Sequence, residues 1–221
     1  MKTDIQQRTS EWFAARLGKI TASNAYKLVS DSKNGNKLSD GALTYILSLI
    51  AETISGEADT DFETAAMAWG NAYERVAIES FEKTIQLKVI YPAPLFTLDS
   101  YENDVCSSPD ALIEELGSII EIKCPQQNNH IAYHLLKNQH DLKTRHKNIY
   151  WQLVLNMLTT KTDSAFFVSF HPGMPTNLKM KILHVDRVQA DCDLLISKID
   201  VALALKHEIL SELLGETKTI R

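Results

Sequence analysis

Long apolar runs, paired cysteines and an excess of positive charge are all missing from this 221-residue chain. No apolar stretch approaches the roughly 20 residues of a membrane-spanning helix, and the N-terminus lacks the apolar core of a signal peptide. The three cysteines, Cys106, Cys124 and Cys192, are odd in number and lack paired spacing. This argues against a disulfide framework, a zinc ribbon and an iron–sulfur cluster, and it predicts a reducing compartment without a membrane partner.

The charge balance is acidic, with 23 basic and 28 acidic residues and a formal net charge of −5. A protein that coats nucleic acid without discrimination is therefore not expected, because phosphate binding is driven by cations. A local basic surface on an acidic body stays compatible with the sequence. Three basic segments, at 16–19, 33–37 and 142–147, are candidates for such a surface, and each fits a solvated face equally well.

The remaining composition is that of an ordinary globular protein, with 44% hydrophobic and 23% charged residues. No repeat, low-complexity tract or interior linker interrupts it, so we expect residues 1–221 to form one domain. Helical periodicity and cap residues predict helices over Ser10–Gly18, Thr21–Val29, Asp40–Ile54, Glu63–Thr84, Ile131–Lys137, Ile149–Leu158 and Arg187–Leu214. Strands are predicted over Val89–Leu98, Val105–Glu114, Ser118–Lys123, Ala165–Phe170 and Leu178–Val185. The pattern predicts an α/β fold with a central mixed β-sheet flanked by helices.

Several details of these helices follow from local signals. Ser10 should cap the first helix and Gly18 should end it, while Gly70 should weaken the fourth. The third helix should bury a stripe of five residues, Leu43, Ile46, Leu47, Ile50 and Ile54. The fourth should bury five others, Trp69, Tyr73, Val76, Ala77 and Phe81.

Two carboxylates and an ammonium are predicted to meet where one strand ends. Within Ser118–Lys123, alternation places Glu121 and Lys123 on one face, with the neighbouring isoleucines pointing the other way into a core. A hairpin would bring Asp110, at the end of the preceding segment, beside Glu121. Metal-assisted phosphodiester hydrolysis needs such a set: hard oxygen ligands for Mg²⁺ and a cation near the attacking water.

The same residues also fit a simpler interpretation. Surface strands carry Glu and Lys because their outer face is wet, and an acid-x-Lys pattern after Pro-Asp also arises by chance. The Ile-x-Ile frame fixes which way the polar pair points. Residue patterns alone leave both interpretations open.

Two weaker constellations involve the N-terminal helices and a histidine pair. Arg16 lies just before a helix start that carries Ser23, so a guanidinium, hydroxyls and free main-chain N–H groups could form an anion pocket. Serine and threonine cap helices everywhere, so this pattern is not specific. His130 and His134 have the spacing of zinc ligands, but Ile131 stands where a metalloprotease has glutamate, which favours ordinary core or surface histidines.

Taken in order along the chain, these blocks resemble the phage lambda exonuclease family of alkaline exonucleases, within the PD-(D/E)xK nuclease superfamily and its restriction-endonuclease-like core. The resemblance covers about 16–170. It rests on Arg16–Ser23, Ala68–Glu74, Ser108–Asp110, Glu121–Pro125 and Gln152, which follow one another in the family's order.

The resemblance implies a role for each matching residue of the strand pair. Asp110 and Glu121, with the main-chain carbonyl of Ile122, would hold catalytic Mg²⁺, with Mn²⁺ as an alternative. Lys123 would orient the attacking water or help deprotonate it, and would stabilise developing charge. The family usually has glycine after Pro-Asp, whereas this chain has Ala111, so we expect a slightly different turn there without loss of activity.

Other roles are implied away from the strands. Glu74 would complete the acidic site, and Gln152 would support the site or the scissile strand. Arg16 and Ser23 would hold the 5′-phosphate of the recessed strand. Met67 falls where the family has an apolar wedge between parting bases, although its periodicity alone predicts a core position.

The expected activity is that of a Mg²⁺-dependent 5′→3′ exonuclease on double-stranded DNA, which releases mononucleotides and leaves a 3′ single strand for recombination. The resemblance also implies a homotrimeric ring with Lys33, Lys37 and Arg145 toward the DNA, an annealing protein as partner, and the cytoplasm of a bacterial host cell. Two alternatives stay open: an endonuclease with the same core, and a DNA-end-binding subunit without catalysis. The intact acidic residues disfavour the second alternative, and the Arg16/Ser23 pocket disfavours the first.

Overall fold

The computed structural model describes residues 1–30, 38–58 and 65–215, apart from the side chains of Ala66 and Met67. Its α-helices are α1 (Ser10–Arg16), α2 (Ala25–Leu28), α3 (Asp40–Ser55), α4 (Ala65–Ile85), α5 (Gln127–His134), α6 (Gln139–Arg145), α7 (Lys147–Thr160) and α8 (Gln189–Leu213). Its strands are β1 (Ile20–Thr21), β2 (Phe96–Thr97), β3 (Val105–Ser107), β4 (Ala111–Ile113), β5 (Ser118–Lys123), β6 (Ser164–Phe170) and β7 (Met180–Asp186). Short 3₁₀ turns are η1 (Ala22–Asn24), η2 (Glu114–Leu116) and η3 (Thr176–Leu178). None of the helices described is long and apolar enough to cross a membrane.

A mixed sheet of four strands in the order β4-β5-β6-β7 forms the predicted centre of the fold. β4 and β5 are antiparallel, β5 and β6 parallel, and β6 and β7 antiparallel. Because parallel neighbours need a crossover, the chain between β5 and β6 forms α5, α6 and α7. The expectation of a central mixed sheet flanked by helices is confirmed.

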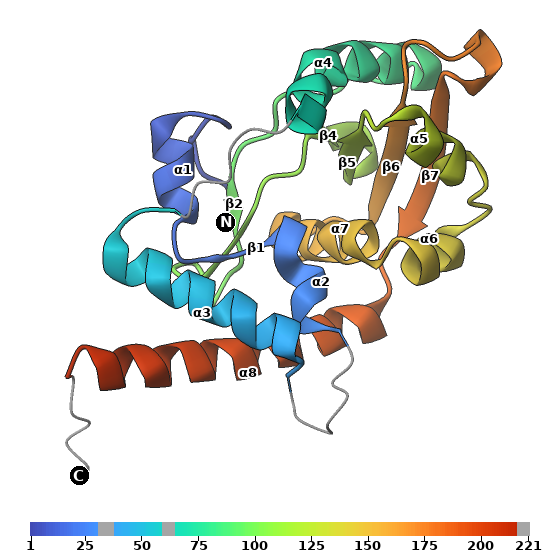
Figure 1. Ribbon diagram of the computed structural model, residues 1–221. Coiled ribbons are helices and arrows are strands. Elements are labelled where there is room, and N and C mark those ends of the chain that lie inside the picture. The colour runs from blue at the N-terminus through green and yellow to red at the C-terminus, as the bar shows by residue number, and fades with distance from the viewer. Residues whose placement is uncertain (31–37, 59–64, 216–221) are drawn as a thin grey trace.

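Helices cover both faces of this sheet, α7 on one side and α4 on the other (Figure 1). Alternation along β5 sends Ile119 toward α7, whereas Ile120 and Ile122 pack with Ala77 and Phe81 of α4. The predicted orientation of the two inner isoleucines is therefore confirmed. The opposite face, which carries Glu121, lies under a helix and is not wet.

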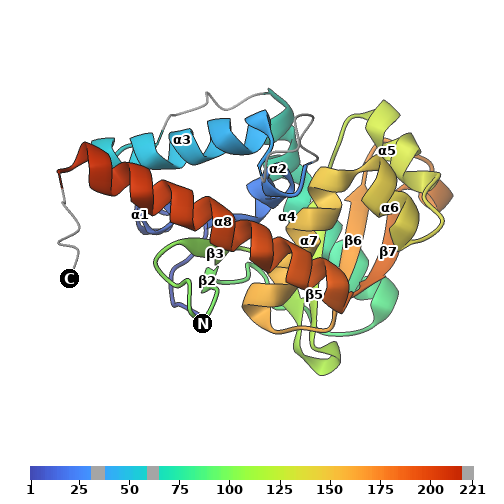
Figure 2. The ribbon, with the colours of Figure 1, turned by 90° about the horizontal axis from the view of Figure 1, so that it is seen from below.

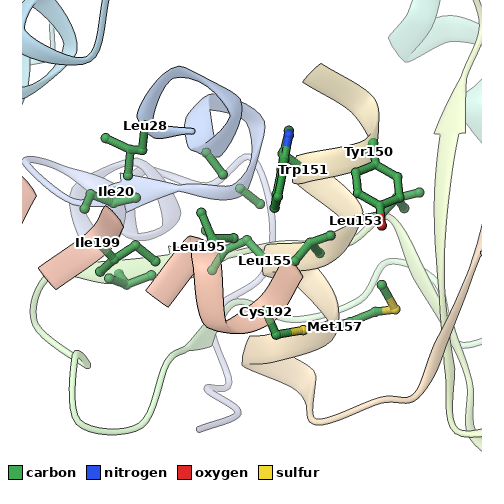
Figure 3. Packing of buried hydrophobic residues seen from close by; sticks show 14 of the residues in the cluster. Ile20, Leu28, Tyr150, Trp151, Leu153, Leu155, Met157, Cys192, Leu195 and Ile199 are labelled. Carbon is green, nitrogen blue, oxygen red and sulfur yellow. The ribbon is translucent and has the colours of Figure 1, made fainter. Parts of the chain in front are cut away.

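A second layer of helices extends the core beyond α7. α3 and α8 lie side by side in both ribbon views (Figures 1 and 2). Figure 3 shows Leu195 and Ile199 of α8 facing Ile20 and Leu28 from the N-terminal region. The C-terminal helix thus packs directly against the segment that follows α1.

A small second sheet, in the order β1-β3-β2, was not expected from the sequence. β1 is only two residues long and pairs in parallel with β3, joining Ile20 to Val105. This pairing brings the segment after Arg16 to the strand that leads toward Asp110.

Two of the predicted strands are wrong in extent. Val89–Leu98 keeps only the two residues of β2, since Pro92 and Pro94 have no N–H to donate to a ladder. Val105–Glu114 divides at Pro109 into β3 and β4, which belong to different sheets. The other three strands are confirmed within two residues of their predicted ends.

Each predicted helix overlaps a helix of the structure, but the bounds differ. Ile131–Lys137 is observed as α5 over Gln127–His134, and Thr21–Val29 is divided into η1 and α2. Thr9, rather than Ser10, caps α1 by accepting a hydrogen bond from the Trp12 N–H. α4 runs through Gly70 without interruption. α6 was missed as a helix, although its cap, Asn138, accepts from the Asp141 N–H.

The buried stripes of α3 and α4 differ from those predicted. On α3, Leu47 and Ile54 are exposed, because the helix turns Tyr45 and Leu49 inward instead. On α4, Trp69 is 37% exposed and Val76 is exposed, whereas Ala77 and Phe81 are buried as predicted. Exposed apolar residues at helical spacing are common, which is why periodicity misassigned them.

Candidate active site

A cavity of about 410 Å³ is lined by residues from six separate parts of the chain. Its walls come from the segment before α1, from α1 and η1, from α4, from the β4–β5 hairpin, from α5 and from α7. Among the lining residues are eight of those predicted for the site: Arg16, Ser23, Glu74, Asp110, Glu121, Ile122, Lys123 and Gln152.

Asp110 is fixed by the hairpin that carries it. Its N–H donates to the Ile120 carbonyl at 3.1 Å, and its carboxylate Oδ2 accepts from the Ile122 N–H at 2.6 Å. The expected approach to Glu121 across a hairpin is thus confirmed. Ala111 follows as the first residue of β4, is buried and has no positive φ, so this turn does not need the conformational freedom of glycine.

Glu121 is almost fully buried, at 1% exposure, and both of its oxygens accept hydrogen bonds. Oε1 accepts from Lys123 Nζ and from Gln152 Nε2, each at 2.6 Å. Oε2 accepts from Asn156 Nδ2 at 3.2 Å. A buried charge of this kind needs partners, and α7 supplies two of the three.

Lys123 is the last residue of β5 and forms an ion pair with Glu121. Burial alone would lower the pKa of its ammonium, but the charges of Glu121 and Asp110 outweigh burial and raise the pKa above its ordinary value. Lys123 therefore carries its proton at neutral pH.

Glu74 reaches the cavity from α4 and is held by two groups outside the predicted set. Arg8 Nη2 lies 2.6 Å from its Oε2, and the Tyr91 hydroxyl donates to Oε1 at 3.3 Å. Its negative charge nevertheless contributes to raising the pKa of Asp110.

The pKa of the Asp110 carboxyl is raised well above its usual range. Burial is the main cause, and the negative charges of Glu121 and Glu74 add to it. A carboxylate crowded by like charges gains from a nearby cation, so this donor set is chemically suited to a divalent ion.

The oxygen ligands available also match magnesium. Asp110, Glu121 and Ile122, which were predicted to supply two carboxylates and a main-chain carbonyl, all line the cavity. Among the described residues, no three His, Cys, Asp or Glu side chains form a metal-binding group. Mg²⁺ typically keeps several waters and uses one or two protein carboxylates with substrate phosphates, so the smaller set fits it.

Arg16 and Ser23 also line the cavity. The guanidinium of Arg16 stacks on Trp12, with 4.1 Å from its carbon to the ring centroid, and burial lowers its pKa from the ordinary value. Ser23 is exposed and lies in η1, with its hydroxyl 3.4 Å from that of Thr21. No acidic side chain of the described residues forms an ion pair with Arg16, which leaves it suited to an anion from outside.

The turn after Arg16 is held at both main-chain groups of Gly18. Its N–H donates to Glu52 Oε2 of α3 at 2.9 Å, and its carbonyl accepts from Lys206 Nζ of α8 at 2.8 Å. Gly18 has a φ of +67°, and a Cβ there would lie 2.3 Å from Thr53 Oγ1. Only glycine fits this turn.

Four further residues, Lys33, Lys37, Met67 and Arg145, were predicted to contact DNA. Lys33 and Lys37 fall outside the described residues, as does the side chain of Met67. Arg145 is exposed at the end of α6. Each of these stays a prediction.

Of the histidine pair, His130 makes the contacts of a buried structural residue. His130 is fully buried, with Nδ1 at 2.7 Å from Ser169 Oγ and Nε2 at 2.7 Å from the Leu178 carbonyl. Its ring therefore already has partners on both nitrogens. Of the two alternatives left by the sequence, core or surface, His130 is thus a core histidine.

The sequence did not reveal several residues that line the cavity or hydrogen-bond to its carboxylates. Trp12 and Asn156 could have been found, because they stand four residues from Arg16 and Gln152 on the same helix faces. Arg8 and Tyr91 gave no such signal. Their approach to Glu74 depends on how the chain folds back.

The chain is similar to a known domain family and to solved structures of exonucleases. Residues 11–163 match the model of the YqaJ-like viral recombinase domain. A crystal structure of the alkaline exonuclease LHK-Exo from Laribacter hongkongensis is 25% identical, with a TM-score of 0.77, over 94% of this chain and 97% of that one. Its complex with dAMP is 24% identical with a TM-score of 0.79 over the same shares, 94% and 97%.

A phage-related exonuclease from Haemophilus somnus 129PT has the same fold at 16% identity, with a TM-score of 0.73 over 88% of this chain and 96% of that one. No curated protein sequence matches the chain.

Proposed function

The chain belongs to the YqaJ-like viral recombinase domain family, and on that premise we propose that it is a Mg²⁺-dependent 5′→3′ exonuclease acting on double-stranded DNA ends. The family and the similarity to an alkaline exonuclease support a DNA exonuclease. One observation carries the finer proposal. A carboxylate–lysine group and an arginine–serine group line the same cavity.

The carboxylate side would perform hydrolysis. Asp110, Glu121 and the Ile122 carbonyl would hold Mg²⁺, which supplies a Lewis acid for the phosphate and an activated water. Gln152 and Asn156 keep the Glu121 carboxylate aimed into the cavity. Mn²⁺ has similar ligand preferences and is the alternative ion.

Lys123 would act through its charge. The neighbouring carboxylates keep the ammonium protonated, so it would orient the water and stabilise the negative charge that develops on the phosphate. Glu74 would bind water or metal at the other side of the cavity once its hold on Arg8 is released.

The phosphate side would set the direction of digestion. Arg16 and Ser23 would bind a terminal 5′-phosphate, which places the first phosphodiester bond toward Asp110 and Glu121. Repeated cleavage from that end would release mononucleotides and leave a 3′ single strand for annealing-based recombination. This arrangement favours an end-dependent enzyme over an endonuclease.

We also propose a homotrimeric ring of single-domain subunits, which would resolve the conflict between a net charge of −5 and a polyanionic substrate. In such a ring Lys33, Lys37 and Arg145 would face the DNA, and an annealing protein in the bacterial cytoplasm would receive the single strand. Sedimentation should then report about three times the 24.9 kDa chain mass. A monomer that digests long duplex through a competitor-DNA trap would contradict the ring.

The decisive experiment compares linear, nicked and closed-circular duplex, with 5′-phosphate or 5′-hydroxyl ends, in Mg²⁺ or EDTA. We expect fast release of mononucleotides from phosphorylated linear duplex in Mg²⁺ and none in EDTA. Cutting of closed circles would favour the endonuclease. Binding of ends without hydrolysis would favour a catalytically inactive subunit.

A further inference from the structure

The segment before α1 enters the cavity and is anchored next to Asp110. Gln7 Nε2 donates to the carbonyls of Pro109 and Ala93, each at 2.8 Å. The carbonyl of Pro109 directly precedes Asp110 in the chain. The segment is therefore fixed relative to the carboxylates, although it lies outside the 11–163 match to the family model.

This anchoring presents Arg8 to the cavity in a strained conformation. Arg8 has a φ of 66°, in the left-handed region that side chains other than glycine, asparagine and aspartate rarely adopt. Its side chain lines the cavity and pairs with Glu74 at 2.6 Å. Strain of this kind persists where the surrounding structure enforces it and is frequent at ligand-binding sites.

The pairing with Glu74 does not explain the strain by itself. The Arg8 side chain is 45% exposed, and ion pairs with an exposed partner contribute little to stability. A guanidinium carries five N–H donors in a planar fork, of which the bond to Glu74 uses one. The rest can serve a ligand with several acceptor oxygens.

Among the charged residues of the cavity, Arg8 is the cation that is open to an anionic ligand. Its lining has three basic residues (Arg8, Arg16 and Lys123) and three acidic residues (Glu74, Asp110 and Glu121). Lys123 is committed to Glu121, and Arg16 lies on the phosphate side over Trp12. Arg8 is thus the cation on the carboxylate side that is half open to solvent.

We propose that Arg8 is a substrate-binding residue that contacts a backbone phosphate of the DNA beside the scissile bond, in place of its contact with Glu74. The proposal rests on the proposed function, since it requires a DNA strand in the cavity. Arg8 would then release Glu74 when the substrate enters. A role limited to neutralising Glu74 is the alternative.

The test measures the affinity for 5′-phosphorylated duplex between 50 and 200 mM salt. Ca²⁺ replaces Mg²⁺, and a gel verifies that the DNA stays intact. Each phosphate contact contributes about 0.9 to the slope of log affinity against log salt, so Arg8→Gln should lower the slope by about one. Arg8→Lys keeps the charge and should restore the slope.

The matched control is Arg75→Gln. Arg75 lies on α4, is exposed and pairs with Glu79, so this variant also removes one charge and one ion pair outside the cavity. Its slope should equal that of the unmodified protein. Thermal unfolding of each variant shows whether it is folded.

Two results would overturn the proposal: an unchanged slope in Arg8→Gln, or an Arg8→Gln effect that disappears in a Glu74→Gln background. If hydrolysis depends on DNA ends while the slope is unchanged, only the role of Arg8 fails. If the slope changes but no DNA end is digested in Mg²⁺, the phosphate contact stands and the exonuclease proposal fails. Absence of any duplex binding would overturn both.

Discussion

The two sides of the cavity are held in place in different ways. On the carboxylate side, Asp110 and Glu121 are fixed by the ladder of one hairpin and by a helix that lies over it. On the phosphate side, Arg16 depends on the turn at Gly18, which is held by Glu52, 34 residues away, and by Lys206, 188 residues away.

This difference has a physical consequence. A main-chain ladder fixes a side chain through many short-range bonds, so that no single substitution outside the hairpin should displace Asp110. On the phosphate side, the position of Arg16 depends on a few long-range side-chain contacts, so one substitution can displace it. Hydrolysis and end recognition should therefore be separable by mutation.

The largest expected effect is loss of hydrolysis from the carboxylate side. Asp110→Ala or Glu121→Ala should abolish Mg²⁺-dependent digestion, because each removes a charged ligand of the ion. Lys123→Ala should lower the rate by roughly 10²–10⁴, the range for a positioned proton-transfer or charge-stabilising group. Release of nucleotides from phosphorylated linear duplex measures these rates, and near-normal rates in all three variants would reduce the cluster to a structural ion pair.

A smaller effect should follow from Arg16→Ala. A charge-assisted contact to a phosphate contributes about 1.5–3 kcal/mol, so the preference for 5′-phosphate over 5′-hydroxyl ends should fall by about 10- to 100-fold. Digestion of 5′-hydroxyl duplex should change little. Equal rates on both ends in the unmodified protein would show that Arg16 has another role.

The same contrast explains what could be predicted from the sequence. Alternation over a few neighbouring residues predicts the strand Ser118–Lys123, the directions of its side chains and its hairpin partner. All three predictions are confirmed. The convergence of Arg16 and Ser23 with the carboxylates followed from family resemblance, because residue patterns alone gave only a weak anion pocket.

What could not be predicted depends on tertiary contacts. Gly18 is held by Glu52 and Lys206, and the local sequence around each of the three residues gives no sign of the other two. Lys206 falls in an ordinary amphipathic helix. The exposure of Trp69 and Leu47 likewise depends on which side the neighbouring helices cover. Pairing of two-residue β1 with β3 is too short to leave a periodic signal.

A still smaller effect is expected when the contact between Lys206 and Gly18 is removed. Lys206→Met keeps the apolar stem but removes both the hydrogen bond to the Gly18 carbonyl and the ion pair with Asp104, each at 2.8 Å. The lost bond to Gly18 itself contributes about 0.5–1.5 kcal/mol. The 5′-phosphate preference should fall by about two- to tenfold, with the rate on 5′-hydroxyl duplex unchanged and partial rescue by Lys206→Arg. Competition between the two substrates measures the ratio.

Lys143→Met is the control for this comparison. Lys143 also forms an ion pair with α8, to Asp191 at 2.6 Å, but it does not touch the Gly18 turn. The variant should keep the full preference. If it lost the preference as Lys206→Met does, general loosening of α8 would explain both results.

The smallest expected effect concerns stability at the carboxylate side. The pKa of Asp110 is raised in the folded protein, chiefly by burial and then by Glu121 and Glu74, so the folded state binds a proton more tightly than the unfolded state. The free energy of unfolding therefore falls as pH rises from the unfolded pKa to the folded pKa. Above the folded pKa this loss of stability is complete. Asp110→Asn keeps an acceptor for the Ile122 N–H but lacks the charge, so in EDTA at neutral pH it should melt higher than the unmodified protein.

The expected gain is a few degrees, since about 1 kcal/mol corresponds to roughly 2–4 °C in a chain of this size. Asp163→Asn, which changes an exposed carboxylate, should not share it. Added Mg²⁺ should raise the melting temperature of the unmodified protein and leave Asp110→Asn unchanged, because an ion that binds only the folded state stabilises it. If Asp110→Asn melted no higher in EDTA, the crowding of carboxylates would be relieved within the protein itself, and the carboxylate side would be as free of strain as the rest of its hairpin.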